Sequence, residues 1–183
     1  MAFAGKQITN SKNGQTYRFI ETAASTGGKM LEMESVYVPN TPEPILHYHP
    51  RQDEYFKILD GEVTVRIGAE KRVLRAGDEL HIPAGTHHGM WNPTNQTAIV
   101  NWKTIPALET EYFFETITGL VNDGKTDQKG KPHLLQTAMT INHFSGMFRL
   151  VKPPYLVQKI LFYTLTPLAW ILGYRATYKK YLD

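Results

Sequence analysis

The chain contains no cysteine among its 183 residues. This absence excludes disulfide scaffolds, thiolate zinc sites, iron–sulfur clusters and cysteine nucleophiles, so a metal ion would depend on histidine and carboxylate ligands. It is compatible with a reducing compartment, and we expect a cytoplasmic protein. The first fourteen residues also lack an apolar run long enough for a signal peptide, so we expect the mature chain to start where the sequence starts.

Other missing features narrow the class of function. Neither sign of charge dominates, because 20 Lys and Arg residues face 17 Asp and Glu residues, and we expect no nucleic-acid partner. No G-x-S-x-G pattern surrounds a serine and no glycine-rich phosphate loop is present, which argues against those hydrolases and against phosphate-loop enzymes. The composition, 42% hydrophobic and 20% charged, is typical of a globular protein with an ordinary core.

The hydrophobic pattern changes near residue 106. From residue 7 to residue 103, short β-rich runs alternate with proline and glycine, which is typical of a sandwich or barrel of many short strands. Asp60-Gly61 separates two such runs and predicts a β-hairpin between residues 55–59 and 63–67, because glycine tolerates positive φ. Residues 68–70 predict a second hairpin.

The rest of the chain has helical periodicity. The spacing of Phe113, Ile117 and Leu120 predicts one helix, and Pro132 precedes a second apolar repeat that begins at Leu134. Residues 153–173 are nearly all apolar and predict a third helix. We therefore divide the chain into a β-barrel domain, residues 1–106, and a C-terminal helical extension, residues 107–183.

Five of the seven histidines lie between residues 47 and 88. His47 and His49 are two residues apart, so on a strand both rings point to the same face, roughly 6.6 Å apart along the chain. Glu54 follows a bend that could return it beside them, and His88 comes from a later segment. Three imidazole nitrogens and one carboxylate oxygen would leave one or two positions open on a metal ion that accepts five or six ligands.

The spacing of these residues resembles that of the two cupin motifs. Nine positions agree: His47, His49, Glu54 and Gly61 in the first motif, and Gly77, Pro83, Gly85, His88 and Asn92 in the second. The 15 residues between the motifs match the short family spacer, whereas Thr41 stands where the first motif usually opens with glycine.

The resemblance covers residues 29–103 and implies a mainly β fold. That fold is a double-stranded β-helix, or jelly-roll barrel, and the C-terminal helices would follow it. It also implies one divalent metal ion, held in the mouth of the barrel by His47, His49, Glu54 and His88. We expect His87, next to a ligand on a strand, to point away from the ion, and His81 to be an ordinary strand residue.

Several activities remain open for such a site. The ligand set suits Fe, Mn, Ni or Zn and does not choose among them. The interpretation we favour is an oxidoreductase of the dioxygenase type that acts on a small enol-type substrate, with Glu54 as the catalytic residue that orients the substrate or accepts its proton. The alternatives are a metal-dependent isomerase or decarboxylase, and a non-catalytic protein that binds or senses a small ligand.

Aromatic side chains along the predicted strands favour an apolar or aromatic ligand over a sugar phosphate. These residues are Tyr37, Tyr48, Tyr55, Phe56, Trp91 and Trp102.

The apolar C-terminal segment is too short to span a membrane. Residues 160–173 are uncharged, but as a helix they reach only about 21 Å, against a hydrocarbon core of about 30 Å. Lysine and arginine residues flank the segment. Two interpretations follow: the helices pack on the barrel or on a partner subunit, which we favour, or they contact a membrane surface peripherally. We expect a homodimer.

Overall fold

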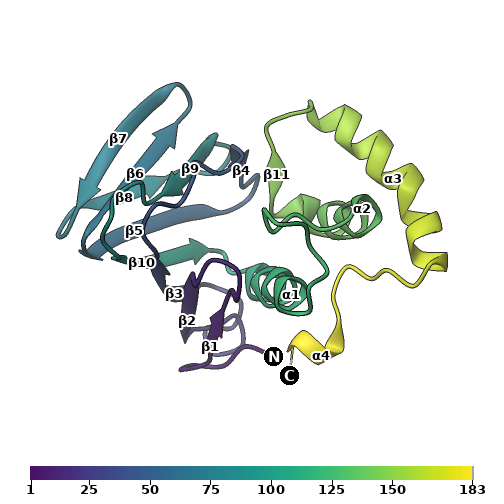
Figure 1. Cartoon of the computed structure of the whole chain (residues 1–183), viewed down its shortest axis with the longest axis horizontal. Coiled ribbons are helices and arrows are strands. Elements are labelled where there is room, and N and C mark those ends of the chain that lie inside the picture. Colours follow the sequence, from purple (N-terminus) through teal and green to yellow (C-terminus); the bar gives the residue numbers. More distant parts are fainter. Residues whose placement is uncertain (183) are drawn as a thin grey trace.

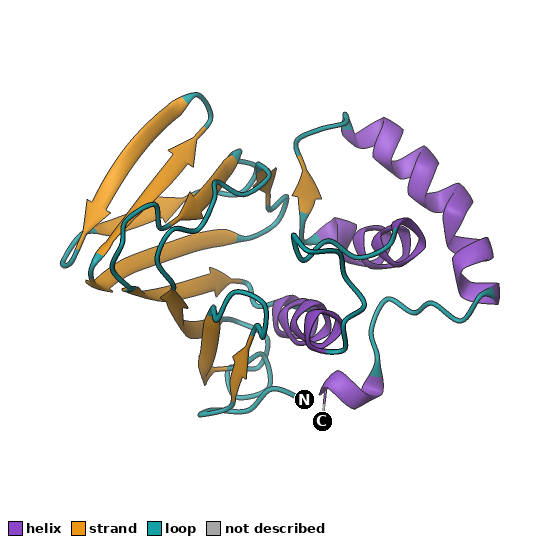
Figure 2. Ribbon diagram, viewed as in Figure 1, coloured by secondary structure: helices purple, strands orange, loops and turns teal. Residues whose placement is uncertain are grey.

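The computed structural model describes residues 1–182. Two antiparallel sheets pack face to face into a double-stranded β-helix, and the C-terminal helices lie at one side of it (Figures 1 and 2). The six-stranded sheet has the order β1 (Gln7–Thr9), β2 (Thr16–Glu21), β3 (Leu31–Tyr37), β10 (Ala98–Ile105), β5 (Asp53–Asp60), β8 (Glu79–Ile82). The five-stranded sheet has the order β11 (Arg149–Leu150), β4 (His47–Tyr48), β9 (His88–Trp91), β6 (Glu62–Ile67), β7 (Glu70–Arg75).

The core lies between the two sheets. Alternate residues of β3 are fully buried, among them Leu31 and Met33, and β10 shows the same alternation with Val100 and Trp102 buried. Because side chains alternate across a strand, one face of each strand supplies the core. The mainly β fold class that the resemblance implies is confirmed.

One of the two predicted hairpins is wrong. The turn at Asp60-Gly61 exists, with Gly61 at φ 74°, but β5 and β6 do not pair, because they belong to different sheets. A Cβ atom on Gly61 would lie 2.5 Å from the carbonyl oxygen of Thr97, so the crossing between sheets admits only glycine here. The second hairpin is confirmed: Ile67 of β6 is opposite Glu70 of β7.

The three predicted helices are present as α1 (Thr110–Asn122), α2 (Leu134–His143) and α3 (Tyr155–Ile171). A 3₁₀ turn, η1 (Phe144–Gly146), follows α2, and α4 (Lys179–Leu182) ends the described chain. Helix α1 packs on the six-stranded sheet, where Phe114 lies 4.7 Å from the ring of Tyr17 and 5.2 Å from that of Trp102.

Helix α3 lies along α2 at the far side of the molecule from strands β1 to β10 (Figure 1). The structure therefore does not bear out the packing of this helix on the barrel. Within residues 1–182, no helix is both long and apolar enough to cross a membrane.

The extension returns to the barrel between α2 and α3. Strand β11 pairs antiparallel with β4, with Leu150 opposite His47. Strand β11 therefore lies beside the strand that carries His47 and that ends just before His49.

Candidate metal centre

Three histidines of the five-stranded sheet converge inside the barrel. His47 on β4 and His88 on β9 are directly opposite each other, and His49 follows β4 by one residue. Directly opposed residues on antiparallel strands have neighbouring side chains, and an i, i+2 pair shares one face. One ring nitrogen from each histidine lies within 4.8 Å of the other two. His49 and His88 are buried, whereas His47 is half-buried.

Each of the three rings directs its Nδ1 atom at a backbone carbonyl. The Nδ1 distances are 3.4 Å from His47 to the oxygen of Ile45, 3.0 Å from His49 to that of Met147, and 2.9 Å from His88 to that of Thr86. A carbonyl oxygen only accepts hydrogen bonds, so Nδ1 carries the hydrogen in each neutral ring. In the neutral form of each ring, Nε2 therefore has a lone pair that can bind a common ligand, as in histidine metal sites whose other nitrogen donates to a carbonyl.

Glu54 reaches the cluster from β5 in the opposite sheet. Its Oε2 atom lies 2.7 Å from Nε2 of His88, and its Oε1 atom lies 3.4 Å from Nε2 of His49. Trp102 on β10 donates a hydrogen bond from Nε1 to Oε1 over 3.1 Å, which orients the carboxylate. Glu54 is almost completely buried, and a carboxylate is buried only when it is paired or binds a cation.

Two polar atoms of the cluster fit a metal ion. Nε2 of His49 is buried without a hydrogen-bond partner, and Oε2 of Glu54 has only its 2.7 Å contact with Nε2 of His88. Leaving such an atom unsatisfied costs about 1–3 kcal/mol, and more for a charged group. The two atoms belong to the same small cluster, so a single cation could satisfy both, and the donor set of imidazole and carboxylate suits a divalent transition metal.

The electrostatics of the cluster favour neutral rings of His47 and His49 and a positive charge on His88, next to Glu54. Burial, with the neighbouring His88 and His49, lowers the pKa of His47 to about 3, and burial likewise lowers the pKa of His49. Burial also opposes ionisation of Glu54, but the neighbouring His49 and then the contact with His88 outweigh it and lower the pKa of Glu54. Burial opposes ionisation of His88 as well, but the contact with Glu54 outweighs it and raises the pKa of His88. A carboxylate that stabilises a proton on His88 would stabilise a divalent cation in the same place.

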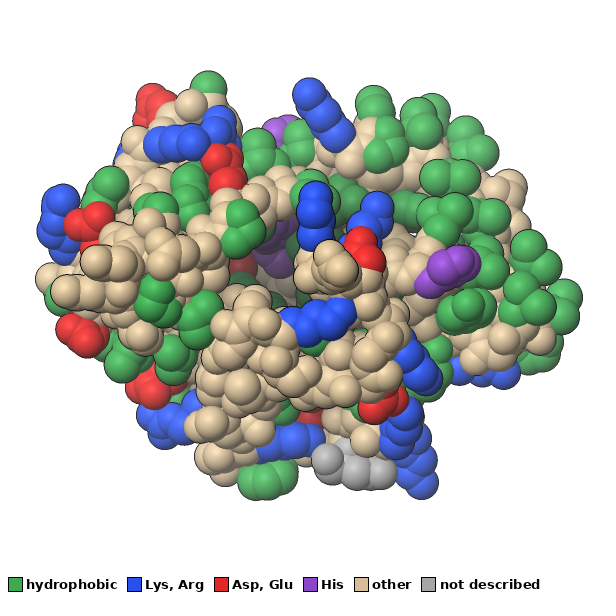
Figure 3. Space-filling view, in the orientation of Figure 1, with side chains coloured by type: hydrophobic (Ala, Val, Ile, Leu, Met, Phe, Trp, Pro, Cys, Tyr) green, Lys and Arg blue, Asp and Glu red, His purple; other side chains and the backbone are tan. Residues whose placement is uncertain are grey.

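Aromatic residues of the helical extension cover the site. Phe148 stacks on the ring of His47 with centroids 4.8 Å apart, and Phe113 of α1 stacks behind it at 5.2 Å. Figure 3 shows the surface hollowed between the barrel and the helical half, with histidine side chains visible inside the hollow. The mouth of the barrel is therefore apolar on the side of the extension.

The structure brings together the four residues that the spacing singles out, His47, His49, Glu54 and His88. His87 is exposed and lies 5.2 Å from the ring of Tyr48, outside the cluster.

One of the aromatic residues on the predicted strands, Tyr55, faces outward and not into the barrel. Tyr55 stacks on His81 at 4.4 Å on the outer face of the six-stranded sheet, so it does not line the interior. These two residues form part of an open groove of about 700 Å³, which also contains the ion pair of Lys57 and Glu79.

Sequence reasoning missed the contribution of the extension. Met147, Phe148 and Phe113 lie outside both motifs, and no local signal links them to the histidines. It also missed the hydrogen bond of Trp102, which was expected only as an aromatic lining residue.

Comparison with known proteins places strands β4 to β9 and the histidine cluster within a family model and finds several relatives. The family model described as "Cupin domain" matches residues 33–102. The probable oxidoreductase virH of Hypocrea virens is 26% identical over 197 residues, a match that covers 97% of this chain and 87% of that protein. Quercetin 2,3-dioxygenase of Bacillus subtilis is 30% identical over 103 residues, covering 56% of this chain and 30% of that enzyme. Among solved structures, a predicted oxalate decarboxylase of Thermotoga maritima aligns with a TM-score of 0.49 and 20% identity over 55% of this chain and 90% of that one.

Proposed function

This chain belongs to the cupin superfamily, and from that premise we propose that it is a metal-dependent oxidoreductase of the dioxygenase type. One observation carries the proposal: three imidazoles, each with Nδ1 occupied by a backbone carbonyl, turn their other nitrogens toward one point beside a buried carboxylate. The similarity to virH, named a probable oxidoreductase, and to quercetin 2,3-dioxygenase supports this class of reaction.

His47, His49 and His88 would hold the ion, with Glu54 as the fourth ligand. When bound, an ion of Fe, Mn or Ni supplies Lewis acidity, redox chemistry and open positions for an enol-type substrate and dioxygen. Zn would supply Lewis acidity alone.

Glu54 is the group that would handle the proton of the substrate. Its Oε1 atom is oriented by Trp102, and its pKa is lowered, so it is present as the carboxylate, which is the form that can accept a proton from an enol hydroxyl. As pH falls through that lowered pKa, the carboxylate takes up a proton and loses this capacity. The indole of Trp102 keeps Oε1 in place while the proton is held.

Phe148 and Phe113 would shape the space above the site. Their stacked rings exclude water from one side of the mouth and offer an apolar surface to a ligand. They favour a small apolar or aromatic substrate, such as a flavonol or a catechol, over a charged one.

The test is metal analysis together with oxygen consumption. Wild-type protein loaded separately with Fe, Mn, Ni and Zn is assayed against a panel of flavonols and catechols in an oxygen electrode. We expect about one metal ion per chain and oxygen uptake with at least one compound. His88→Ala should lose the metal and the oxygen uptake. His87→Ala is the matched control, because His87 is adjacent in sequence but lies outside the cluster.

The outcomes separate the alternatives. Equal metal content in wild type and His88→Ala would disprove the ligand assignment. Metal binding with turnover of an enol but no oxygen uptake would indicate an isomerase or decarboxylase. Metal and ligand binding without any turnover would indicate a non-catalytic protein that binds or senses a small ligand.

A further inference from the structure

The outer side of α3 is apolar and exposed. Nine large hydrophobic side chains of this helix and its end, with exposures between 41% and 73%, form what we call the α3 surface. They are Leu156, Val157, Ile160, Leu161, Tyr163, Leu168, Trp170, Ile171 and Leu172. Residues 1–182 contain seventeen exposed large hydrophobic side chains, so more than half of them are concentrated on α3 and the residue that follows it. Figure 3 shows this concentration as hydrophobic side chains gathered over α3.

The orientation of α3 is fixed by contacts on its inner side. Gln158 is buried and donates hydrogen bonds from Nε2 to the carbonyl oxygens of Leu150, at 2.8 Å, and Pro153, at 2.5 Å. Phe162 and Ala169 are the other buried residues of the helix. Rotating α3 to bury its apolar side would break these hydrogen bonds, so the exposure is a property of the fold.

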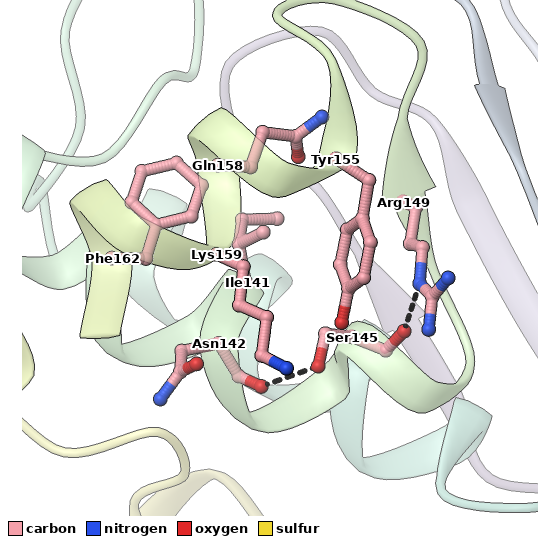
Figure 4. A pocket seen from close by; sticks show the side chains of 8 residues that line it. All are labelled: Ile141, Asn142, Ser145, Arg149, Tyr155, Gln158, Lys159 and Phe162. Atoms are coloured by element: carbon pink, nitrogen blue, oxygen red, sulfur yellow. Dashed lines mark hydrogen bonds between the residues drawn. The ribbon is translucent and has the colours of Figure 1, made fainter.

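The space beneath α3 is too small for a ligand. Figure 4 shows the side chains that line a cavity between α2, η1 and α3, among them Tyr155, Gln158 and Phe162. Its volume is about 10 Å³, close to the smallest space that holds one water molecule. The inner side of α3 therefore offers no space for a ligand, and its exposed apolar side chains are on the outer side.

Charge is distributed unevenly along the chain. Residues 128–182 contain eight Lys and Arg residues and no Asp or Glu, whereas residues 1–127 contain twelve basic and sixteen acidic residues. Basic groups stand at both ends of α3: the guanidinium of Arg149 lies 3.7 Å from the ring centroid of Tyr155, and that of Arg175 lies 5.2 Å from the ring of Trp170. Lys180 of α4 forms an ion pair with Asp123, which neutralises part of the positive charge of α4.

The apolar side of α3 and the basic residues around it indicate what kind of partner the α3 surface binds. An apolar helix side bordered by Lys and Arg, with Trp and Tyr among its exposed residues, is typical of helices that lie in the plane of a membrane surface. A second copy of the same surface would bring basic segments together with no acidic residue between positions 128 and 182 to pair with them. We propose that the α3 surface binds an anionic lipid bilayer reversibly, with α3 lying parallel to the membrane.

Vesicle sedimentation of the whole protein tests this proposal. The vesicles are phosphatidylcholine with or without phosphatidylserine, at low salt and at about 1 M salt, where the Debye length falls to about 3 Å. We expect binding to the anionic vesicles at low salt. We expect it to weaken at least tenfold at high salt and on neutral vesicles.

Two pairs of variants separate the apolar and the charged contributions. The double variant Ile160→Asp with Ile171→Asp should weaken binding at least tenfold, since burial of one large aliphatic side chain contributes about a factor of ten or more. Both residues are exposed, and Val73→Asp on the barrel is the matched control. Lys152→Gln with Lys159→Gln should weaken binding to anionic vesicles selectively, with Lys29→Gln and Lys57→Gln as the control pair.

Each outcome decides the proposal. Wild-type protein that sediments with neither kind of vesicle, or equally with both, would overturn it. Light scattering gives the oligomeric state in parallel. A dimer that the Ile160→Asp, Ile171→Asp variant converts to a monomer, without vesicle binding by the wild type, would assign the surface to a second copy. Unchanged melting curves of the charge variants show that the loss concerns the surface and not the fold.

Discussion

The backbone carbonyl of Met147 accepts a hydrogen bond from Nδ1 of His49 over 3.0 Å, although 98 residues separate the two. This contact holds the His49 ring in the tautomer that leaves Nε2 free, and it ties the extension to the proposed metal ligand. The neighbouring residue, Phe148, lies on the ring of His47. The extension therefore contributes contacts to the candidate metal centre.

Metal binding should stabilise the fold. A ligand that binds only the native state at one hundred times its dissociation constant adds about 2.7 kcal/mol to the free energy of unfolding, and 1 kcal/mol raises Tm by about 2–4 °C for a chain of this size. We expect added divalent metal to raise Tm by roughly 5–10 °C and a chelator to reverse the rise, as followed by circular dichroism. His49→Ala should show no rise, and His87→Ala should behave as wild type. A rise that survives His49→Ala would place the ion elsewhere.

Trp102→Phe should lower the affinity for the metal ion without leaving a large cavity in the core. The ring that stacks on Phe56 at 5.5 Å would be largely retained, but Oε1 of Glu54 would lose its donor. Loss of such an outer hydrogen bond typically lowers metal affinity or activity by about 10–100-fold. Metal titration by calorimetry measures the effect, with Trp91→Phe in the other sheet as control. Equal affinities of the two variants would show that the indole does not position the carboxylate.

Phe148→Ala should open the mouth of the barrel. The substitution removes the ring between His47 and Phe113, while the backbone contact of Met147 with His49 remains. We expect the metal content to be unchanged and the release of metal to a chelator to accelerate by about tenfold, the rate equivalent of 1.4 kcal/mol. Stopped-flow measurement with a coloured chelator gives the rate. Phe3→Ala, at an exposed position, is the control and should leave the rate unchanged.

Gln52→Leu should destabilise the junction of barrel and extension. The buried amide of Gln52 donates from Nε2 to the carbonyl oxygens of Pro106 and Ala107, at 2.8 and 3.0 Å, and contacts Oγ1 of Thr110 at 2.8 Å. Leucine leaves the carbonyl oxygen of Pro106 without the donor from Gln52, at about 1–3 kcal/mol, whereas the carbonyl of Ala107 keeps the hydrogen bond from Oγ1 of Thr110. We expect the free energy of unfolding to fall by about 1–3 kcal/mol in urea titrations. The exposed Gln7→Leu should change it by less than about 0.5 kcal/mol.

The amino-acid sequence by itself determined the barrel and the identity of the clustered residues. Alternation of side chains along the strands is local, and so is the spacing that places His47 and His49 on one face. Two motifs of known spacing were therefore enough to indicate His88 and Glu54 as their neighbours, and the structure brings these four residues together.

Only the tertiary structure decided how strands and helices combine around that site. A turn at Asp60-Gly61 carries no information on whether its strands pair, so the predicted hairpin was wrong where the chain passes between sheets. No local pattern brings Met147 and Phe148 to the histidines, because that contact depends on packing between distant segments. The exposed side of α3 likewise follows from the hydrogen bonds of Gln158, which hold the polar residue inward and leave the apolar ones facing outward.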